Sequence, residues 1–440
     1  MAAPIGQDDD AGLASQPEVL SNFRAAVGAR KHAVESHVRM RAQRYAVADS
    51  HAQSLGEEGR LEAVQAHHDF ENEMVRRSRR RWTTADFEQL RVLGEGGFGT
   101  VHLVQSRGSQ HLLALKQMSK EAHKRKNKRV FTERNVLAEA RSTWIVELFA
   151  TFQDRDYVFM AMEFGQGGDL RGHLQRREPG NGEYGRFTHD EVVFYTAELL
   201  EALDTVHKCG FVHRDIKPDN IVLTREGHLK LLDFGLCIGN ADQQDLCGSP
   251  PYLAAEAFEG PGAFSPASDL WALGVVAFEC LYGRPLWPPP RELSNQGPAA
   301  FRWLKENVIV RYEHYLRTNL KSAERKGLLT SELRRLFERL ICPRGNRLRA
   351  DALRREPLFR CLDFGALHEV EPPIRPALSG PDDTSMFPQC PDRRLPSPYS
   401  GPGVDPALSW SWYELDGESH HMSRPDVLRD RLRRSGHGGA

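Results

Sequence analysis

Apolar and polar residues alternate over residues 87–105, around a group of glycines, in the way that hairpin strands do. Similar patterns predict strands at 112–117, 146–152 and 157–164. A helical pattern surrounds Glu133, between the third and fourth of these predicted strands. This half of the chain is therefore expected to form a small lobe rich in antiparallel strands.

Beyond Gly168 the hydrophobic spacing becomes mainly helical, interrupted by short strand-like pieces at 221–223 and 229–232. The most apolar stretch, 270–282, is shorter than a membrane span and contains Glu279, so it predicts a buried core helix. The pattern predicts an α+β protein in which a small sheet lobe precedes a larger helical lobe, with no membrane span.

Both ends of the chain lack the pattern of a packed core. Residues 1–54 show little apolar periodicity and are expected to be disordered or loosely helical. Apolar positions over 55–81 instead fit an amphipathic helix that ends in a basic cluster. That cluster is either a solvated helix face or a docking surface for an acidic partner. From Pro372 onward, proline, serine and glycine predict an extended tail.

The composition narrows the class of protein. The 440 residues contain 59 Lys and Arg against 60 Asp and Glu, a formal charge of -1, which argues against a nucleic-acid-binding coat. The 7 cysteines are odd in number and form no CxxC pair, so a reduced intracellular chain is expected.

A glycine-rich segment, GEGGFGTV from Gly94 to Val101, matches GxGxxGxV. By itself this motif can also serve a turn or a dinucleotide site, but a dinucleotide fold would continue into a helix. A strand carrying Lys116 follows instead. Glu133 on the next predicted helix can pair with Lys116 and aim its ammonium group at nucleotide phosphates.

The strongest chemical signal is HRDIKPDN, residues 213–220, followed by Asp233-Phe234-Gly235. Asp215 can accept the proton of an incoming hydroxyl, and Lys217 can place positive charge beside the transferred phosphoryl group. Asn220 and Asp233 offer the hard oxygen ligands that Mg²⁺ prefers. The ordered set of glycine loop, lysine, glutamate, HRD and DFG is improbable by chance.

At these residues the chain resembles the eukaryotic protein kinases, over residues 87–360, and HRDIKPDN is the serine/threonine form. The resemblance implies the bilobal kinase fold and the use of ATP and Mg²⁺. It also implies a pivot helix with Asp269, Trp271 and Gly274 and a buried Glu256–Arg347 ion pair. The implied nucleotide-binding residues are Gly94, Gly96, Phe98, Gly99, Val101, Ala114, Lys116, Met162 as gatekeeper, Glu163 and Gly165 in the hinge, Asp169 at the ribose, Asn220 and Asp233.

EFGQGGDL and the tail segment DTSMF resemble the AGC group of kinases, where Phe387 would tether the tail over the nucleotide. RSTWIVELF and the arginine cluster before the domain resemble the NDR/LATS branch. GSPPYLAAE is most similar to fungal mitotic-exit and septation kinases. This resemblance implies that residues 55–86 bind a Mob-type co-activator. It also implies that residues 361–440 form a regulatory tail open to an upstream kinase. The protein is expected in the cytoplasm, and the resemblance also allows the nucleus and division-site or spindle-pole structures as locations.

Three acidic residues, Asp169, Asp219 and Glu279, stand where related AGC kinases receive substrate arginines. Charge-assisted pairing there would favour protein substrates with basic residues upstream of the target serine or threonine. The alternative is that these carboxylates only keep the cleft surface solvated.

Three positions are expected to be regulatory: Asp245, Ser249 and Ser411. Asp245 replaces the phosphorylatable residue that relatives carry four positions before Ser249, and could pair permanently with Arg214. Ser411 lies in Trp410-Ser411-Trp412, which resembles the phosphorylated hydrophobic motif of AGC tails. Alternatively, the tryptophans simply cap the surface, and Asp245 is an ordinary loop residue.

Three functions are compatible with these motifs. The first is an active serine/threonine protein kinase, and the second is a pseudokinase scaffold that binds a Mob-type partner without catalysis. The third is a small-molecule phosphotransferase with a similar nucleotide cleft. Intact Lys116, Glu133, Asp215, Asn220 and Asp233 favour the first.

Overall fold

A computed structural model describes residues 82–397 and the two-residue strand β10, Trp412–Tyr413. The stretches within 82–397 that it does not describe are 97–98, 109, 124–126, 141, 178–184, 240–245, 261–262, 288–289, 294–296 and 308. The predicted disordered segment 1–54, the basic helix over 55–81, Asp245 and Ser411 therefore lie outside the described residues.

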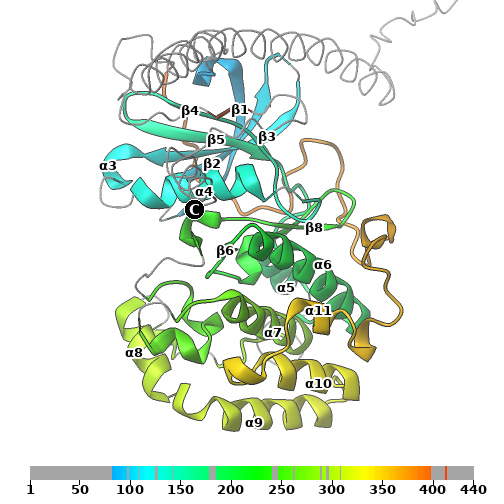
Figure 1. The fold of residues 1–440 in the computed structure, drawn as a ribbon. Helices are drawn as coiled ribbons and strands as arrows, with labels where there is room; N and C mark the ends of the chain where they lie inside the picture. The colour runs from blue at the N-terminus through cyan, green and yellow to red at the C-terminus, as the bar shows by residue number, and fades with distance from the viewer. Residues whose placement is uncertain are drawn as a thin grey trace, which may run out of the picture. The chain divides into compact units, whose positions relative to one another are not determined.

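The small lobe contains an antiparallel sheet in which five strands run in the order β1-β2-β3-β5-β4 (Figure 1). Every strand predicted from the alternating pattern in this half of the chain is present. Two helices, α3 (Lys120–His123) and α4 (Asn127–Glu139), follow β3. The strands are β1 (Phe87–Gly96), β2 (Gly99–Ser106), β3 (Leu112–Ser119), β4 (Leu148–Gln153) and β5 (Tyr157–Glu163).

The larger lobe is mainly helical, as expected, and short strand pairs lie beside the helices (Figure 1). Its longer helices are α5 (Leu170–Arg176), α6 (His189–Lys208), α7 (Pro266–Tyr282), α8 (Gly297–Asn307), α9 (Tyr312–Arg325) and α10 (Ser331–Leu340). The shorter elements are β6 (Phe211–Val212), β7 (Ile221–Leu223), β8 (Leu229–Leu231), β9 (Ile238–Gly239) and α11 (Ala350–Leu353). Among the described residues, no helix is both long and apolar enough to cross a membrane.

Helix α7 is the predicted core helix and forms the centre of the larger lobe. Every residue from Ser268 to Tyr282 is buried, because apolar residues surround the helix on all sides. Ser265 is the N-cap residue and its amide donates to the hydroxyl of Ser268, Pro266 stands in the first turn, and Gly283 ends the helix in the left-handed conformation. Local sequence features therefore define both ends of α7, the helix that contains Asp269 and Glu279.

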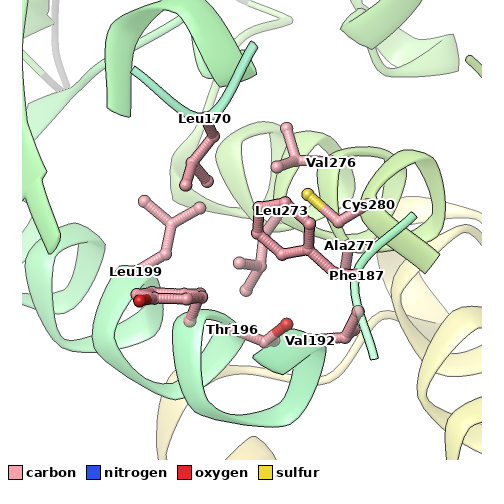
Figure 2. Close-up of a pocket in the computed structure, with 10 residues that line it drawn as sticks. Leu170, Phe187, Val192, Thr196, Leu199, Leu273, Val276, Ala277 and Cys280 are labelled. Atoms are coloured by element: carbon pink, nitrogen blue, oxygen red, sulfur yellow. The ribbon is translucent and has the colours of Figure 1, made fainter. Parts of the chain in front are cut away.

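Figure 2 shows how α5, α6 and α7 meet around a small, mostly apolar cavity. Leu170 from α5 and Leu199 from α6 lie around it with Leu273 and Cys280 from α7. Such an apolar cavity is a packing gap in the core rather than a ligand site. Leu170 at the start of α5 and Leu273 of α7 line the same cavity, so the first turn of α5 lies near the central helix.

The described part of the tail, residues 361–397, runs along both lobes as mostly irregular chain (orange in Figure 1). Ile374 is buried against the larger lobe, and the amide of Gln166 donates to the carbonyl oxygens of Gly380 and Asp383. Further along, Gln89 of β1 is hydrogen-bonded to Arg393 and Leu395. The tail therefore packs on the two lobes and has no core of its own.

Candidate active site

Lys116 lies at the centre of β3, opposite Val101 of β2 and Met160 of β5. Its Nζ atom is 2.7 and 2.9 Å from the two carboxylate oxygens of Glu133 and 3.4 Å from Oδ1 of Asp233. All three side chains are largely buried. The sheet, helix α4 and the DFG segment thus meet at one ammonium group. The pairing with Glu133 is the one that the sequence predicts, and the contact with Asp233 is an addition to it.

Lys116 and its carboxylate neighbours shift one another's pKa values; burial and the nearby Asp233 raise the pKa of Glu133, which Lys116 opposes. Burial alone would lower the pKa of Lys116, but the carboxylates of Asp233 and Glu133 raise it well above its ordinary value. Burial likewise opposes ionisation of Asp233, yet Lys116 lowers the pKa of that carboxyl. Lys116 is therefore charged at neutral pH, and Asp233 is an anion suited to binding a divalent cation.

Asp215 is held in place by three neighbouring side chains. Its Oδ2 atom accepts from Nζ of Lys217 at 2.8 Å and from the amide of Asn220 at 3.1 Å. Its Oδ1 atom accepts from the hydroxyl of Ser249 at 2.7 Å, and Ser249 also accepts from Lys217 at 3.1 Å. These bonds orient the carboxylate that is expected to take the hydroxyl proton.

Ser249, which the sequence predicts to be a regulatory residue of the activation segment, makes a contact that the sequence did not predict. Its hydroxyl lies between Asp215 and Lys217, inside the catalytic cluster. The sequence contained only an indirect signal, a serine before Pro250 at the point where relatives carry Thr/Ser-Pro. Ser249 is therefore a positioning residue for Asp215.

Two strained residues frame the catalytic loop. Arg214 and Asp233 have positive φ angles, 69° and 57°, which are uncommon for residues with side chains. Asp269, at the start of α7, stabilises this backbone because its oxygens accept from the amides of His213 and Arg214, both at 2.8 Å. His207 donates to Asp269 as well and helps to lower the pKa of this buried carboxyl, against the effect of burial.

The glycine segment forms the turn end of the β1–β2 hairpin. Gly94 is paired with Val101 and Gly96 with Gly99, while Phe98 lies outside the described residues. Gly99 has a φ of 129°, and a Cβ atom there would lie 2.1 Å from the carbonyl oxygen of Gln117 on β3. Only glycine fits this close approach, so the hairpin can lie flat against the strand that carries Lys116.

The predicted adenine side of the site is apolar. Ala114 is paired with Met162 across β3 and β5, and both side chains are buried. Beside them, Glu163 forms an ion pair with Lys230 at 2.9 Å, and Gly165 lies against Val222. The side chain of Glu163 is therefore paired with the larger lobe, and its backbone amide donates to the carbonyl oxygen of Glu147.

The described tail closes one side of this region. The ring of Phe387 stacks on Phe164 with centroids 5.5 Å apart, in a cluster that includes Ala114 and Val101. Arg91 of β1 donates to Thr384 and to the carbonyl of Pro388, and Met386 lies directly against Gly168. Phe387 thus occupies the predicted place, whereas the anchoring role of Arg91 had no recognisable sequence signal.

The three acids expected to receive substrate arginines have different environments. Asp169 caps α5 by accepting from the amide of Gly172 at 2.6 Å, and burial raises its pKa. Asp219 is about half exposed, with 49% of its side chain accessible. Glu279 contradicts the expectation, because it is fully buried and both its oxygens accept from neighbours, Arg171 and Tyr252. It is not open to a substrate.

The expected ion pair between Glu256 and Arg347 is present and buried. The guanidinium of Arg347 makes two hydrogen bonds to the carboxylate of Glu256, of 2.6 and 3.1 Å. It also donates to the carbonyls of Ala267 and Cys342 and lies over the ring of Trp271. This pair fastens the end of the activation segment to the helical lobe.

The donor set fits the nucleotide and the cation that the motifs imply. The amide nitrogen of Asn220 donates two hydrogen bonds to Asp215, one to the backbone carbonyl and one to the carboxylate. The Oδ1 atom of Asn220 takes part in neither bond. That oxygen and the ionised Asp233 are hard ligands of the kind Mg²⁺ prefers. Lys116, charged and fixed by Glu133, is placed to hold phosphate oxygens.

Comparison with known proteins identifies the family. Residues 87–359 match the protein kinase domain. Over 430 residues, covering 87% of each chain, the sequence is 30% identical to the serine/threonine-protein kinase sax-1 of Caenorhabditis briggsae.

Two further relatives support the same branch. The chain is 32% identical to the serine/threonine-protein kinase CBK1 of Yarrowia lipolytica, over 84% of this chain and 68% of that one. It is 30% identical to the probable serine/threonine-protein kinase ndrB of Dictyostelium discoideum, over 74% and 67%. The kinase motifs, the arrangement of Lys116, Asp215 and Asp233, and these matches together show that the chain belongs to the serine/threonine protein kinases of the NDR/LATS type.

Proposed function

We propose that this kinase transfers the γ-phosphate of ATP to serine or threonine in proteins with basic residues upstream of the target. The catalytic part of this proposal rests on two observed arrangements. Lys116 is paired with Glu133 and Asp233, and Asp215 is oriented by three hydrogen bonds. Degenerate kinases characteristically lose such groups, so a pseudokinase scaffold is the less favoured reading.

The roles of the residues follow from their contacts. Asp215 accepts the proton of the substrate hydroxyl, while Ser249 and Asn220 hold its carboxylate in place. Lys217, 2.8 Å from Asp215, provides positive charge beside the transferred group. Mg²⁺ held by Asn220 and Asp233 would neutralise charge on the phosphates. Most of the catalytic effect is thus positioning and electrostatic stabilisation.

The preference for basic substrates rests on Asp169 and Asp219. Both carboxylates lie near the catalytic loop, Asp219 in the turn Pro218–Asn220 and Asp169 at the start of α5. Each retains some solvent exposure, so a substrate arginine could pair with them through charge-assisted hydrogen bonds.

The regulatory part of the proposal rests on the sequence. The five arginines between Arg76 and Arg81 would meet acidic residues of a Mob-type co-activator, and Ser411 would be phosphorylated by an upstream kinase. Asp245 would provide the negative charge that phosphorylation supplies in relatives. We place the protein in cell-cycle, cytokinesis or morphogenesis signalling, in the cytoplasm and at division-site structures.

One experiment tests the catalytic proposal. The purified full chain is incubated with labelled ATP, Mg²⁺ and an arginine-rich serine peptide, beside an Asp233→Ala control. We expect phosphate on the serine of the peptide with the wild type only, and a higher rate when a Mob-type protein is added. Equal labelling by both proteins, or none with the co-activator present, would refute catalysis by this site.

A further inference from the structure

Arg171, in the first turn of α5, is embedded among acidic and phenolic groups. Its Nη1 atom is 2.6 Å from Glu279 Oε1, its Nη2 atom is 2.6 Å from the hydroxyl of Tyr252, and its Nε atom is 3.5 Å from Asp219 Oδ2. The side chain is largely buried, with 17% exposed. One guanidinium therefore joins two of the three acids that were expected to receive a substrate arginine.

Neighbouring side chains occupy both oxygens of the Glu279 carboxylate. Tyr252 donates to its second oxygen at 2.7 Å, while Arg171 occupies the first. Glu279 lies on α7 and has no solvent-exposed surface. A buried carboxylate without a cation would be costly, so this site requires a guanidinium or ammonium group from some source. In this chain the group comes from α5.

Two short segments connect this arrangement to the reacting centre. Asp219 precedes Asn220, whose amide is hydrogen-bonded to Asp215. Tyr252 follows three residues after Ser249, whose hydroxyl is bonded to the other oxygen of Asp215. Since one residue spans at most about 3.6 Å, the Arg171 cluster lies within reach of a peptide bound at Asp215.

We propose that Arg171 is a built-in replacement for a substrate arginine and thereby a specificity-determining residue. This inference rests on the proposed protein kinase function and refines its substrate class. Arg171 satisfies Glu279 from within the chain, so the enzyme selects no arginine at the substrate position that would face Glu279. Basic selection is left to Asp169 and the exposed part of Asp219.

A purely structural ion pair makes a different prediction. If Arg171 only stabilised the fold, its removal would lower stability and overall rate without changing the preference among peptides. A replacement for a substrate group has a distinctive property: its removal uncovers an acidic subsite, and a peptide that carries the missing arginine gains from it. The gain of a new preference is therefore the decisive measurement.

The main experiment compares serine peptides in which each upstream position is Arg or Ala in turn. In the Arg171→Ala enzyme we expect the Arg/Ala ratio of kcat/KM to rise about tenfold at one upstream position where the wild type shows little preference. The rise should vanish in the Arg171→Ala/Glu279→Gln double variant. Arg177→Ala is the matched control, because it removes a nearby arginine that pairs with Glu191 instead. An unchanged profile in folded Arg171→Ala overturns the proposal.

A second arm covers the case in which Arg171→Ala does not fold. In Glu279→Gln the amide oxygen can still accept from Arg171 while the amide nitrogen donates to the hydroxyl of Tyr252, and we expect this variant to have the wild-type Arg/Ala profile. Loss of an arginine preference in this variant would mean that substrate, and not Arg171, uses Glu279, and would overturn the proposal.

A third measurement separates this inference from the proposed function. Ethylguanidinium, a mimic of the arginine side chain, should raise the melting temperature of Arg171→Ala but not that of the wild type. The absence of any such rise in the folded variant counts against an open acidic subsite. If the wild type phosphorylates no peptide, the proposed function fails, and this binding readout still decides the role of Arg171.

Discussion

The hydroxyl of Ser249 lies 2.7 Å from Oδ1 of Asp215 and donates a hydrogen bond to it. The two residues are 34 positions apart in the chain, so the correct placement of the activation segment determines whether Asp215 is oriented for proton transfer. Ser249 accepts from Lys217 as well. This contact links activation-segment folding directly to the catalytic base.

We therefore expect Ser249→Ala to lower kcat about 10- to 100-fold, since it removes a hydrogen bond to a charged group. Ser249→Thr keeps the hydroxyl and should retain most of the activity. Ser249→Asp places a second carboxylate beside Asp215 and should inactivate the enzyme. The measurement is steady-state peptide phosphorylation with circular dichroism as a folding check. If alanine and threonine behaved alike, the hydroxyl would have no such role.

Removing the ammonium group of Lys116 should impair both activity and stability. Lys116→Met leaves Glu133 and Asp233 without their shared cation, so we expect at least a roughly 100-fold loss of kcat/KM and a destabilisation of about 3–5 kcal/mol. The double variant Lys116→Met/Glu133→Gln should recover stability but not activity. Urea denaturation and ATP kinetics measure the two effects separately. Joint recovery of both would contradict a catalytic role for Lys116.

The Glu256–Arg347 pair offers a test of stability away from the reacting groups. Arg347→Met leaves a buried carboxylate unpaired and should reduce the free energy of unfolding by about 3–5 kcal/mol. Adding Glu256→Leu should restore much of this, because the buried charge is then gone. A double-mutant cycle from urea denaturation provides the coupling energy. Additive effects would show that the two residues do not interact.

The contact between Phe387 and Phe164 should assist nucleotide binding. Phe387→Ala removes an aromatic pair worth about 0.5–1.5 kcal/mol together with buried area, so we expect KM for ATP to rise several-fold. Cys390→Ala, three residues further along the tail, is the control and should leave KM unaltered. An equal KM for ATP in wild type and Phe387→Ala would show that this tail contact does not contribute to nucleotide binding.

A buried histidine in the small sheet makes stability depend on pH. Burial lowers the pKa of His102, an effect partly opposed by its hydrogen bond to Gln117. Because the folded-state pKa is below the unfolded value, His102 contributes its stability above about pH 6.5, and this is lost as the pH falls through the folded value. The free energy of unfolding should therefore fall less between pH 7.5 and 5 in His102→Gln than in the wild type. If the free energy of unfolding changed equally with pH in both proteins, His102 would not be the source of the pH dependence.

The sequence predicted much of the fold because its patterns are local. The alternation over residues 87–105 appears as β1 and β2, and the apolar run 270–282 as the buried part of α7. Lys116 pairs with Glu133 as expected, since fixed spacing within a known family implies fixed geometry. Segments such as the Arg76–Arg81 cluster stay predictions because they lie outside the described residues.

Side-chain pairings across distant segments were less predictable. Glu279 was expected to face a substrate, yet Arg171, 108 positions earlier, already occupies its carboxylate. Ser249 was predicted to be regulatory, and its hydrogen bond to Asp215 was not foreseen. In both cases the sequence did not show which groups meet, because a carboxylate or hydroxyl in the sequence has several possible partners and packing selects among them.

The sequence by itself determined the reaction class, since the chemistry of phosphoryl transfer requires the glycine loop, Lys116, Asp215 and Asp233 in a recognisable order. The tertiary structure alone decided which charges are available to a substrate. Burial makes an unpaired charge costly, so each buried acid must find a cation wherever the fold brings one near. That requirement acts through space, and for Glu279 it is met by Arg171 of helix α5.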